Sequence, residues 1–161
     1  MSTQIHNRGV NVNITKSFQG TNVSLLRLKK VAKAICERFK ISKVALSIAL
    51  IDNTEIRKAN KRFLGRNNIT DCLSFDLSDA KSKTRSFELL INAEKAVEEA
   101  SFRGHSSEAE LALYITHGLL HQLGFDDSTD RQAKKMHLAE DEILQQLGYG
   151  AVYNKKPKIK K

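Results

Sequence analysis

The sequence predicts an α/β fold of the α+β type, in which helices pack on a small mixed four-stranded sheet. Three observations predict it: short apolar runs of strand length alternate with amphipathic stretches of helical length, three helical stretches follow one another near the end, and no segment repeats. Such an order of elements builds a sheet layer covered by helices. The predicted elements occupy residues 10–14, 24–40, 44–51, 54–63, 71–77, 87–92, 94–103, 106–123 and 130–147.

The first four elements are predicted to be strand, helix, strand and helix. Residues 10–14 alternate apolar and polar side chains, as a half-buried strand does. Residues 24–40 place their apolar side chains on one helical stripe, and Ser24 is a plausible N-cap. Residues 44–51 are rich in branched apolar side chains and predict a buried strand. A turn then starts a short helix over 54–63.

Two more strands and a helix follow. Residues 71–77 and 87–92 have the composition of strands, and a polar, charged loop separates them. Residues 94–103 predict a helix that ends at Gly104, because glycine is favoured directly after the last helical turn.

The last two elements are both helices. The first covers residues 106–123, where Glu110 is available for a capping box with Ser107 and Gly124 ends the helix. The second covers residues 130–147.

Composition narrows the class of protein. The 161 residues suit one domain, which we place at residues 1–153, and the apolar share of 40% and charged share of 28% are ordinary for a soluble protein. No apolar run is long enough to span a membrane, and the polar start of the chain does not resemble a secretory signal. The two cysteines, Cys36 and Cys72, form no metal-type pair and are expected to be small buried hydrophobes. Such sparse usage predicts a reducing compartment, hence a cytoplasmic protein.

The positive charge is concentrated at the C-terminal end. The net charge is +9, and the five lysines of residues 154–161 leave only +4 for the rest. We expect these residues to form a basic, disordered tail, separate from the domain. A basic tail on a mildly basic body favours a polyanionic partner such as RNA or the ribosome. A tail that only aids solubility is the alternative, and charge alone does not decide between them.

The segment HGLLHQLGFDD, residues 117–127, carries the chemistry. His117 and His121 are four residues apart, which stacks both imidazoles on one helical face. Gly124 lets the chain turn back, so that Asp127 can supply a third ligand to the same ion. Three protein ligands leave one position open for water, as in catalytic zinc sites. The segment therefore predicts one zinc ion per chain.

Two other interpretations of this segment are less well supported by its residues. Histidines at this spacing can be ordinary core or surface residues, but the surrounding apolar residues predict a buried helix, in which two histidines without a purpose would be costly. Zinc peptidases place a glutamate directly after the first histidine as the general base. Here that position is Gly118, which disfavours proteolysis.

The sequence resembles the YbeY family of endoribonucleases, which are ribosomal RNA maturation factors. The family signature H-G-x-L-H-L-x-G-Y-D-H is similar to residues 117–127, and the stretch P-T-(D/N)-V-L-S-F is similar to residues 69–75. Asn60 and a closing helix around Met136 also match, so that the resemblance covers about residues 40–147.

The resemblance implies a function and a set of partners. It implies a metzincin-like metal-binding helix and a zinc-dependent, single-strand-specific endoribonuclease. The substrate would be ribosomal RNA, processed at the 3′ end of the 16S RNA of the small ribosomal subunit, with a further role in ribosome quality control. Single-stranded RNA and the small subunit are the expected partners, and DNA is not expected.

The chain departs from the family pattern at the site. The third family ligand is histidine, and here it is Asp127, whose oxygen zinc accepts at a similar distance. Asp126 competes for this role, but the family pattern places its aspartate outside the ligand set. A functional arginine of the family is Leu64 here, flanked by Arg62 and Arg66. Either arginine could replace it as the phosphate contact, or both could be plain surface charge.

The sequence leaves the catalytic group open. The nucleophile could be metal-bound water or the RNA 2′-hydroxyl. Thr70 and Ser74 could line the cleft, or they could be local caps or core hydroxyls. Because of the departures at Leu64 and Gly118, a non-catalytic ribosome-assembly factor with a structural metal is the alternative from another class, and a metallopeptidase is a third.

Overall fold

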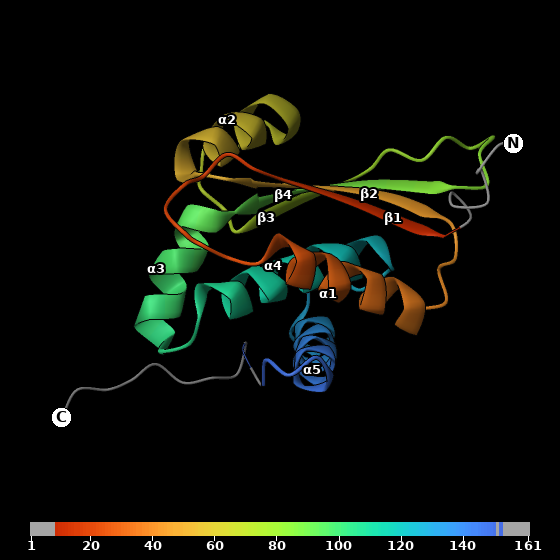
Figure 1. The fold of residues 1–161 in the computed structure, drawn as a ribbon. Helices are drawn as coiled ribbons and strands as arrows, with labels where there is room; N and C mark the ends of the chain where they lie inside the picture. Colours follow the sequence, from red (N-terminus) through yellow and green to blue (C-terminus); the bar gives the residue numbers. More distant parts are fainter. Residues whose placement is uncertain (1–8, 151, 153–161) are drawn as a thin grey trace, which may run out of the picture.

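The computed structural model describes residues 9–150 and 152, which form one mixed sheet and a set of helices (Figure 1). Residues 154–161, predicted to be a tail, lie outside the described residues. No helix among the described residues is both long and apolar enough to cross a membrane. The elements are β1 (Val10–Lys16), α1 (Leu25–Arg38), β2 (Val44–Ile51), α2 (Asn53–Leu64), β3 (Cys72–Asp76), β4 (Arg85–Asn92), α3 (Ala93–Arg103), α4 (Ser107–Gln122) and α5 (Asp130–Gln146).

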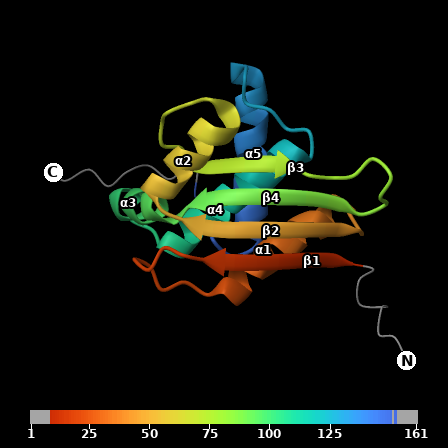
Figure 2. The same cartoon turned by 90° about the horizontal axis from the view of Figure 1, so that it is seen from above.

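The sheet has the strand order β1-β2-β4-β3, as Figure 2 shows from above. β1, β2 and β4 are parallel, with Ile48 of β2 opposite Leu89 of β4, and β3 runs antiparallel along β4. The prediction of a small mixed four-stranded sheet is therefore confirmed. β3 is the edge strand at one end of this order, and its residues form part of one wall of a cleft.

The helices cover the two faces of the sheet unequally. Figure 1 shows α1 and α4 beneath the sheet with α5 beyond them, whereas α2 lies on the other side at one end. α4 contacts β3, β4 and three helices, and it is buried along almost its whole length. On the other face, Ile56 of α2 packs against Ile51 and Leu73 in a small second core.

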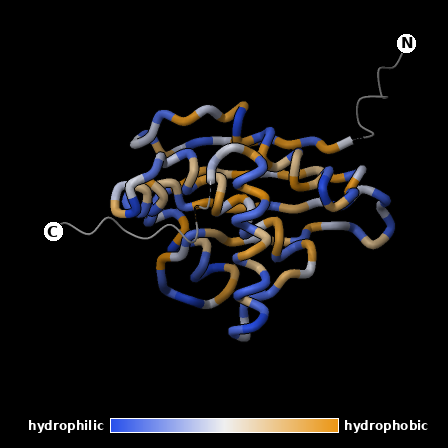
Figure 3. The backbone as a smooth tube through the Cα atoms, turned by 90° about the horizontal axis from the view of Figure 1, so that it is seen from below, coloured by the Kyte–Doolittle hydropathy of each residue, from blue (hydrophilic) through white to orange (hydrophobic). Residues whose placement is uncertain are grey.

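The prediction that residues 44–51 form a fully buried strand is wrong for one face. Ala45 and Ser47 are exposed, whereas Leu46 and Ile48 belong to the core. The reason is that α2 reaches only one end of this face, so the rest of it stays open. Figure 3 shows the hydropathy of each residue along the backbone, with hydrophobic and hydrophilic segments in close succession.

Helix caps explain where several elements begin. The Ser24 hydroxyl accepts a hydrogen bond from the backbone N–H of Arg27, as an N-cap does. For α4 the capping box is wrong: Ser106, not Ser107, is the N-cap, and Glu110 turns into the protein. Its carboxylate oxygen lies 2.6 Å from Nε2 of His105, a partner 5 residues away that helix periodicity does not indicate.

Candidate metal centre and cleft

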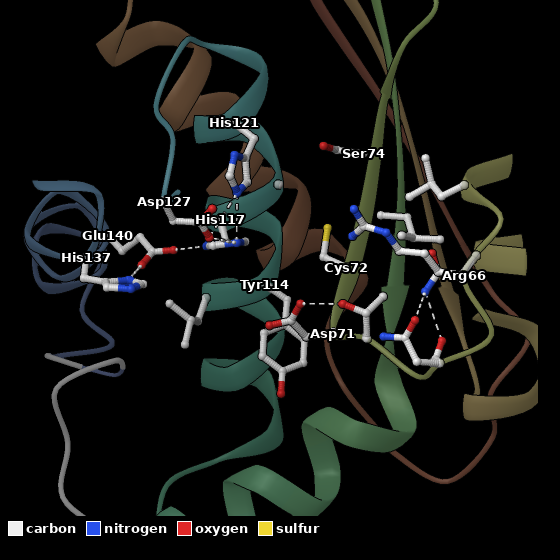
Figure 4. Close-up of a pocket in the computed structure, with 17 residues that line it drawn as sticks. Arg66, Asp71, Cys72, Ser74, Tyr114, His117, His121, Asp127, His137 and Glu140 are labelled. Atoms are coloured by element: carbon white, nitrogen blue, oxygen red, sulfur yellow. Dashed lines mark hydrogen bonds and ion pairs between the residues drawn. The ribbon is translucent and has the colours of Figure 1, made fainter. Parts of the chain in front are cut away.

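A cleft of about 560 Å³ opens at the β3 edge of the sheet. One wall consists of residues from α4 and α5 and of Asp127 from the loop between them, and the other consists of β3 and the connection between α2 and β3 (Figure 4). Segments far apart in the sequence therefore meet here, including residues 69–75 and residues 117–127, the two stretches that carry the family resemblance.

The three predicted metal ligands lie together in this cleft. Nε2 of His117 is 3.2 Å from Nε2 of His121, and Oδ2 of Asp127 is 3.7 Å and 3.6 Å from these two nitrogens. Ligand atoms bound tetrahedrally at about 2.1 Å would be about 3.4 Å apart. The three atoms thus form a nearly equilateral triangle of the size that one metal ion requires, and the residues present fit the implied metal.

The end of α4 brings Asp127 back to the histidines. The helix ends at its C-cap Leu123, and Gly124 has a φ of +99°, which glycine adopts without strain. The backbone N–H of Phe125 then donates to the carbonyl of Leu120, which closes the turn. The chain reverses within these few residues, so that a side chain six positions after His121 reaches the same point.

The structure also distinguishes the two adjacent aspartates. Both carboxylate oxygens of Asp126 accept local hydrogen bonds, one from the backbone N–H of Asp127 and one from the Ser128 hydroxyl. These bonds lower the pKa of Asp126, mainly through the serine. These two hydrogen bonds hold the Asp126 side chain within the turn. In contrast, one carboxylate oxygen of Asp127 faces both histidines.

Glu140 of α5 is a functional residue that sequence reasoning missed. Its carboxylate is fully buried and accepts from Nδ1 of His117 at 2.7 Å and from Nδ1 of His137 at 2.6 Å. A hydrogen bond at Nδ1 leaves the lone pair of the His117 ring on Nε2, the atom that faces the other two ligands. A signal was present in the sequence: Glu140 falls four residues after Met136, within the apolar stripe of its helix.

The electrostatics of the cleft favour a cation. Burial lowers the pKa of His117, but the hydrogen bond and charge of Glu140, together with Asp71 and Asp127, outweigh it and raise this pKa overall. Three carboxylates therefore stabilise positive charge at one imidazole. The same field favours a metal cation beside that ring.

Gly118 lies where α4 packs closely against the sheet. A Cβ at this position would lie 2.7 Å from Sγ of Cys72, closer than real Cβ contacts, and 3.1 Å from Cδ2 of Leu89, tighter than most of them. A side chain at this position would displace these neighbours, so the packing disfavours the glutamate that serves as general base in the peptidases. The prediction that Cys72 is buried holds only in part: it packs against the helix but lines the cleft and is partly exposed. The burial of its thiol raises the pKa well above the usual range. Cys36 lies in the core, as predicted.

The two candidate arginines are placed differently. Arg66 lines the cleft on the wall opposite the histidines, as does Leu64, whereas Arg62 does not line it. The guanidinium of Arg62 instead lies over the ring of Phe63, 5.4 Å from its centroid.

The two hydroxyl candidates both lie at the cleft. Thr70 and Ser74 line it, and the Ser74 hydroxyl accepts a hydrogen bond from the side chain of Gln122.

Comparisons with known proteins identify relatives of this chain. The family model described as Endoribonuclease YbeY matches residues 12–148. A protein from Syntrophomonas wolfei named endoribonuclease YbeY is 31% identical over 158 residues, covering 91% of this chain and 97% of its own. One from Caldanaerobacter subterraneus with the same name is 31% identical and covers 92% and 98%.

A solved structure supports the fold. The solution structure of TM1509 from Thermotoga maritima is 20% identical, covers 94% of this chain and 99% of its own, and has a TM-score of 0.55. Its likeness concerns the fold alone. With the family model matching most of the chain and relatives above 30% identity along nearly all of it, the predicted resemblance is confirmed: the chain belongs to the YbeY family of endoribonucleases.

Proposed function

We propose that the protein is a zinc-dependent, single-strand-specific endoribonuclease that processes ribosomal RNA in the cytoplasm, at the 3′ end of the small-subunit RNA, and takes part in ribosome quality control. The observation that carries the proposal is the triangle of His117, His121 and Asp127 in the lining of a cleft, in a chain of an endoribonuclease family.

The metal would be held by His117, His121 and Asp127, one ion per chain. When bound, zinc supplies Lewis-acid chemistry, which polarises a phosphodiester and activates a water molecule. Glu140 holds the His117 ring so that Nε2 faces the ion. Among the described residues, three side chains of metal-binding type converge on this point. Because Asp127 is 42% exposed, the site is open toward the cleft. An open position distinguishes catalytic from structural zinc sites, which use four protein ligands.

Arg66 is the phosphate contact that the cleft favours. It lies across the cleft from the metal ligands, so a strand passing between the walls would have its backbone between a guanidinium and the metal. Guanidinium groups bind phosphate oxygens in pairs of hydrogen bonds, which fixes the orientation of the phosphodiester. Arg66 thus takes over the role that the family gives to an arginine at position 64, which is leucine in this chain.

The dimensions of the cleft support a single strand as the substrate. Cavities of about 300–1,000 Å³ enclose ligands of small-molecule size, and about 560 Å³ therefore admits a short stretch of flexible chain. Single strands can also present unstacked bases to the protein.

A side-by-side assay tests the proposal. The protein, with one equivalent of zinc and after chelator treatment, is offered a labelled single-stranded ribosomal RNA fragment, the same RNA as a duplex, and casein. We expect metal-dependent cleavage of the single strand alone. Cleavage of casein would indicate a peptidase, and RNA binding without any cleavage would indicate an assembly factor with a structural metal; either outcome refutes the proposal.

The arginines give an internal comparison in the same assay. Arg66→Ala should lower kcat/KM about 10- to 100-fold, the range expected for one lost hydrogen-bonded contact to a charged group. Arg62→Ala, which changes an arginine outside the cleft, should have a clearly smaller effect. Equal effects would refute the assignment to Arg66 alone, and a reversed order would assign the phosphate contact to Arg62.

A further inference from the structure

Phe63 is an exposed aromatic residue next to the cleft, although it does not itself line it. It lies in the last turn of α2 beside Leu64, which lines the cleft, and 58% of its surface is exposed. Its ring belongs to neither hydrophobic core; it lies edge-to-face with Phe75, with centroids 5.5 Å apart, and beneath the guanidinium of Arg62. Much of this ring is available to a ligand.

The surface around Phe63 is strongly basic. Residues 57–66 contain three arginines and two lysines and no acidic residue. All five cationic side chains are exposed, and none of them forms an ion pair within 4.0 Å among the described residues. Exposed cations interleaved with an aromatic ring form the combination with which proteins bind single-stranded nucleic acids: the cations meet the phosphates, and the ring stacks on a base.

We propose that Phe63 is a stacking platform for one nucleobase of a single-stranded RNA that enters the cleft past the end of α2. This inference rests on the proposed function and adds a determinant of substrate class to it. A base can stack on the ring only if it is free of its own stacked neighbours, which holds for a single strand and not for a duplex. Stacking is tolerant of sequence because every base has a π-face. Phe63 therefore contributes to strand selection without selecting a sequence.

The aromatic pair with Phe75 holds the platform in place. An edge-to-face contact at an interplanar angle of 64° restrains the Phe63 ring, which would otherwise rotate freely at an exposed position. Phe75 lies on the same face of β3 as Leu73, which lines the cleft, so the ring is tied to the edge strand that forms one wall. A restrained ring loses less entropy when a base stacks on it.

The test compares Phe63→Ala with Phe63→Tyr and with Phe102→Ala. Phe102 is a matched control, since it is 64% exposed on α3, none of whose residues lines the cleft, whereas Phe63 directly precedes the cleft-lining Leu64. Binding of a single-stranded RNA of about ten nucleotides carrying 2-aminopurine is followed by the quenching of the 2-aminopurine fluorescence, which reports stacking directly. Cleavage of the same RNA gives kcat and KM.

We expect Phe63→Ala to weaken RNA binding and raise KM about 5- to 100-fold and to abolish the quenching, with kcat changed far less. Phe63→Tyr, which keeps the ring, and Phe102→Ala should behave like the unmodified protein. If Phe63→Ala binds, quenches and cleaves like Phe102→Ala while the unmodified protein is active, the platform is refuted and the proposed function stands. If the unmodified protein neither binds nor cleaves RNA, both are refuted.

Discussion

Replacing Gly118 by alanine should destabilise the fold by about 1–2 kcal/mol. The added Cβ would lie 2.7 Å from Sγ of Cys72 and 3.1 Å from Cδ2 of Leu89, both in the packed sheet. Overpacking of this kind costs about 1–3 kcal/mol, and two simultaneous contacts place the cost in the upper part of that range. The better helix propensity of alanine returns about 1 kcal/mol. The free energy of unfolding of both proteins is measured by urea denaturation. Equal m-values show that the substitution changes stability and not the compactness of either state.

A double-mutant cycle with Cys72→Ala provides the control for this prediction. The second substitution removes the sulfur atom that the new Cβ would meet, so the two changes together should be at least about 1 kcal/mol less harmful than their sum. If Gly118→Ala is as stable as the unmodified protein, or if the cycle shows no coupling, α4 does not pack against the sheet as closely as described. The explanation given for the missing peptidase base would then be wrong.

The metal centre and a buried thiol give three more tests. Glu140→Gln should weaken zinc affinity about 10- to 100-fold, because the hydrogen bond that orients His117 is weakened; competition with a chelator measures this, and an unchanged affinity would refute the orienting role. Asp127→Ala should lower the zinc content and Asp127→His should retain it, whereas Asp126→Ala should leave it at one per chain. Elemental analysis measures the zinc content of the three variants. A loss of zinc in Asp126→Ala alone would show that Asp126, not Asp127, is the third ligand. Burial raises the pKa of Cys36 from 9.0 to about 11, so the unfolded chain loses its thiol proton first as the pH rises. The stability that this thiol contributes is therefore complete below pH 9 and falls by up to about 3 kcal/mol as the pH rises to 11. The pH dependence of unfolding in Cys36→Ala should lack this component, and an identical alkaline loss in both proteins would contradict the prediction.

The elements were largely predictable because their patterns are local. The apolar stripe of residues 24–40 and the N-cap Ser24 depend on neighbours three or four positions away, and α1 begins where the cap predicts. The strand over 44–51 was placed correctly at both ends, but its exposed face was not foreseen. Whether a second layer covers a sheet face depends on where α2 packs, and that is a property of the whole fold.

The candidate site was predictable to the extent that it is continuous in sequence. His117, His121 and Asp127 fall within eleven residues, so their spacing was enough to predict that they lie close together. In the structure their ligand atoms lie within 4.8 Å of one another. Glu140 and Arg66 come from segments that only the tertiary structure joins to this one. No local pattern distinguishes Arg66 from Arg62, because both are cations beside Leu64 and only the turn after α2 directs one of them toward the cleft.

Metal-dependent cleavage tests the central claim most directly. Chelator-treated protein is titrated with zinc while the cleavage of single-stranded RNA is followed, and His121→Ala serves as the inactive comparison. The account predicts no cleavage without metal, a rise that saturates at one zinc per chain, and no such rise in His121→Ala. Full cleavage by the metal-free protein, or zinc binding at one equivalent without any cleavage, would contradict it.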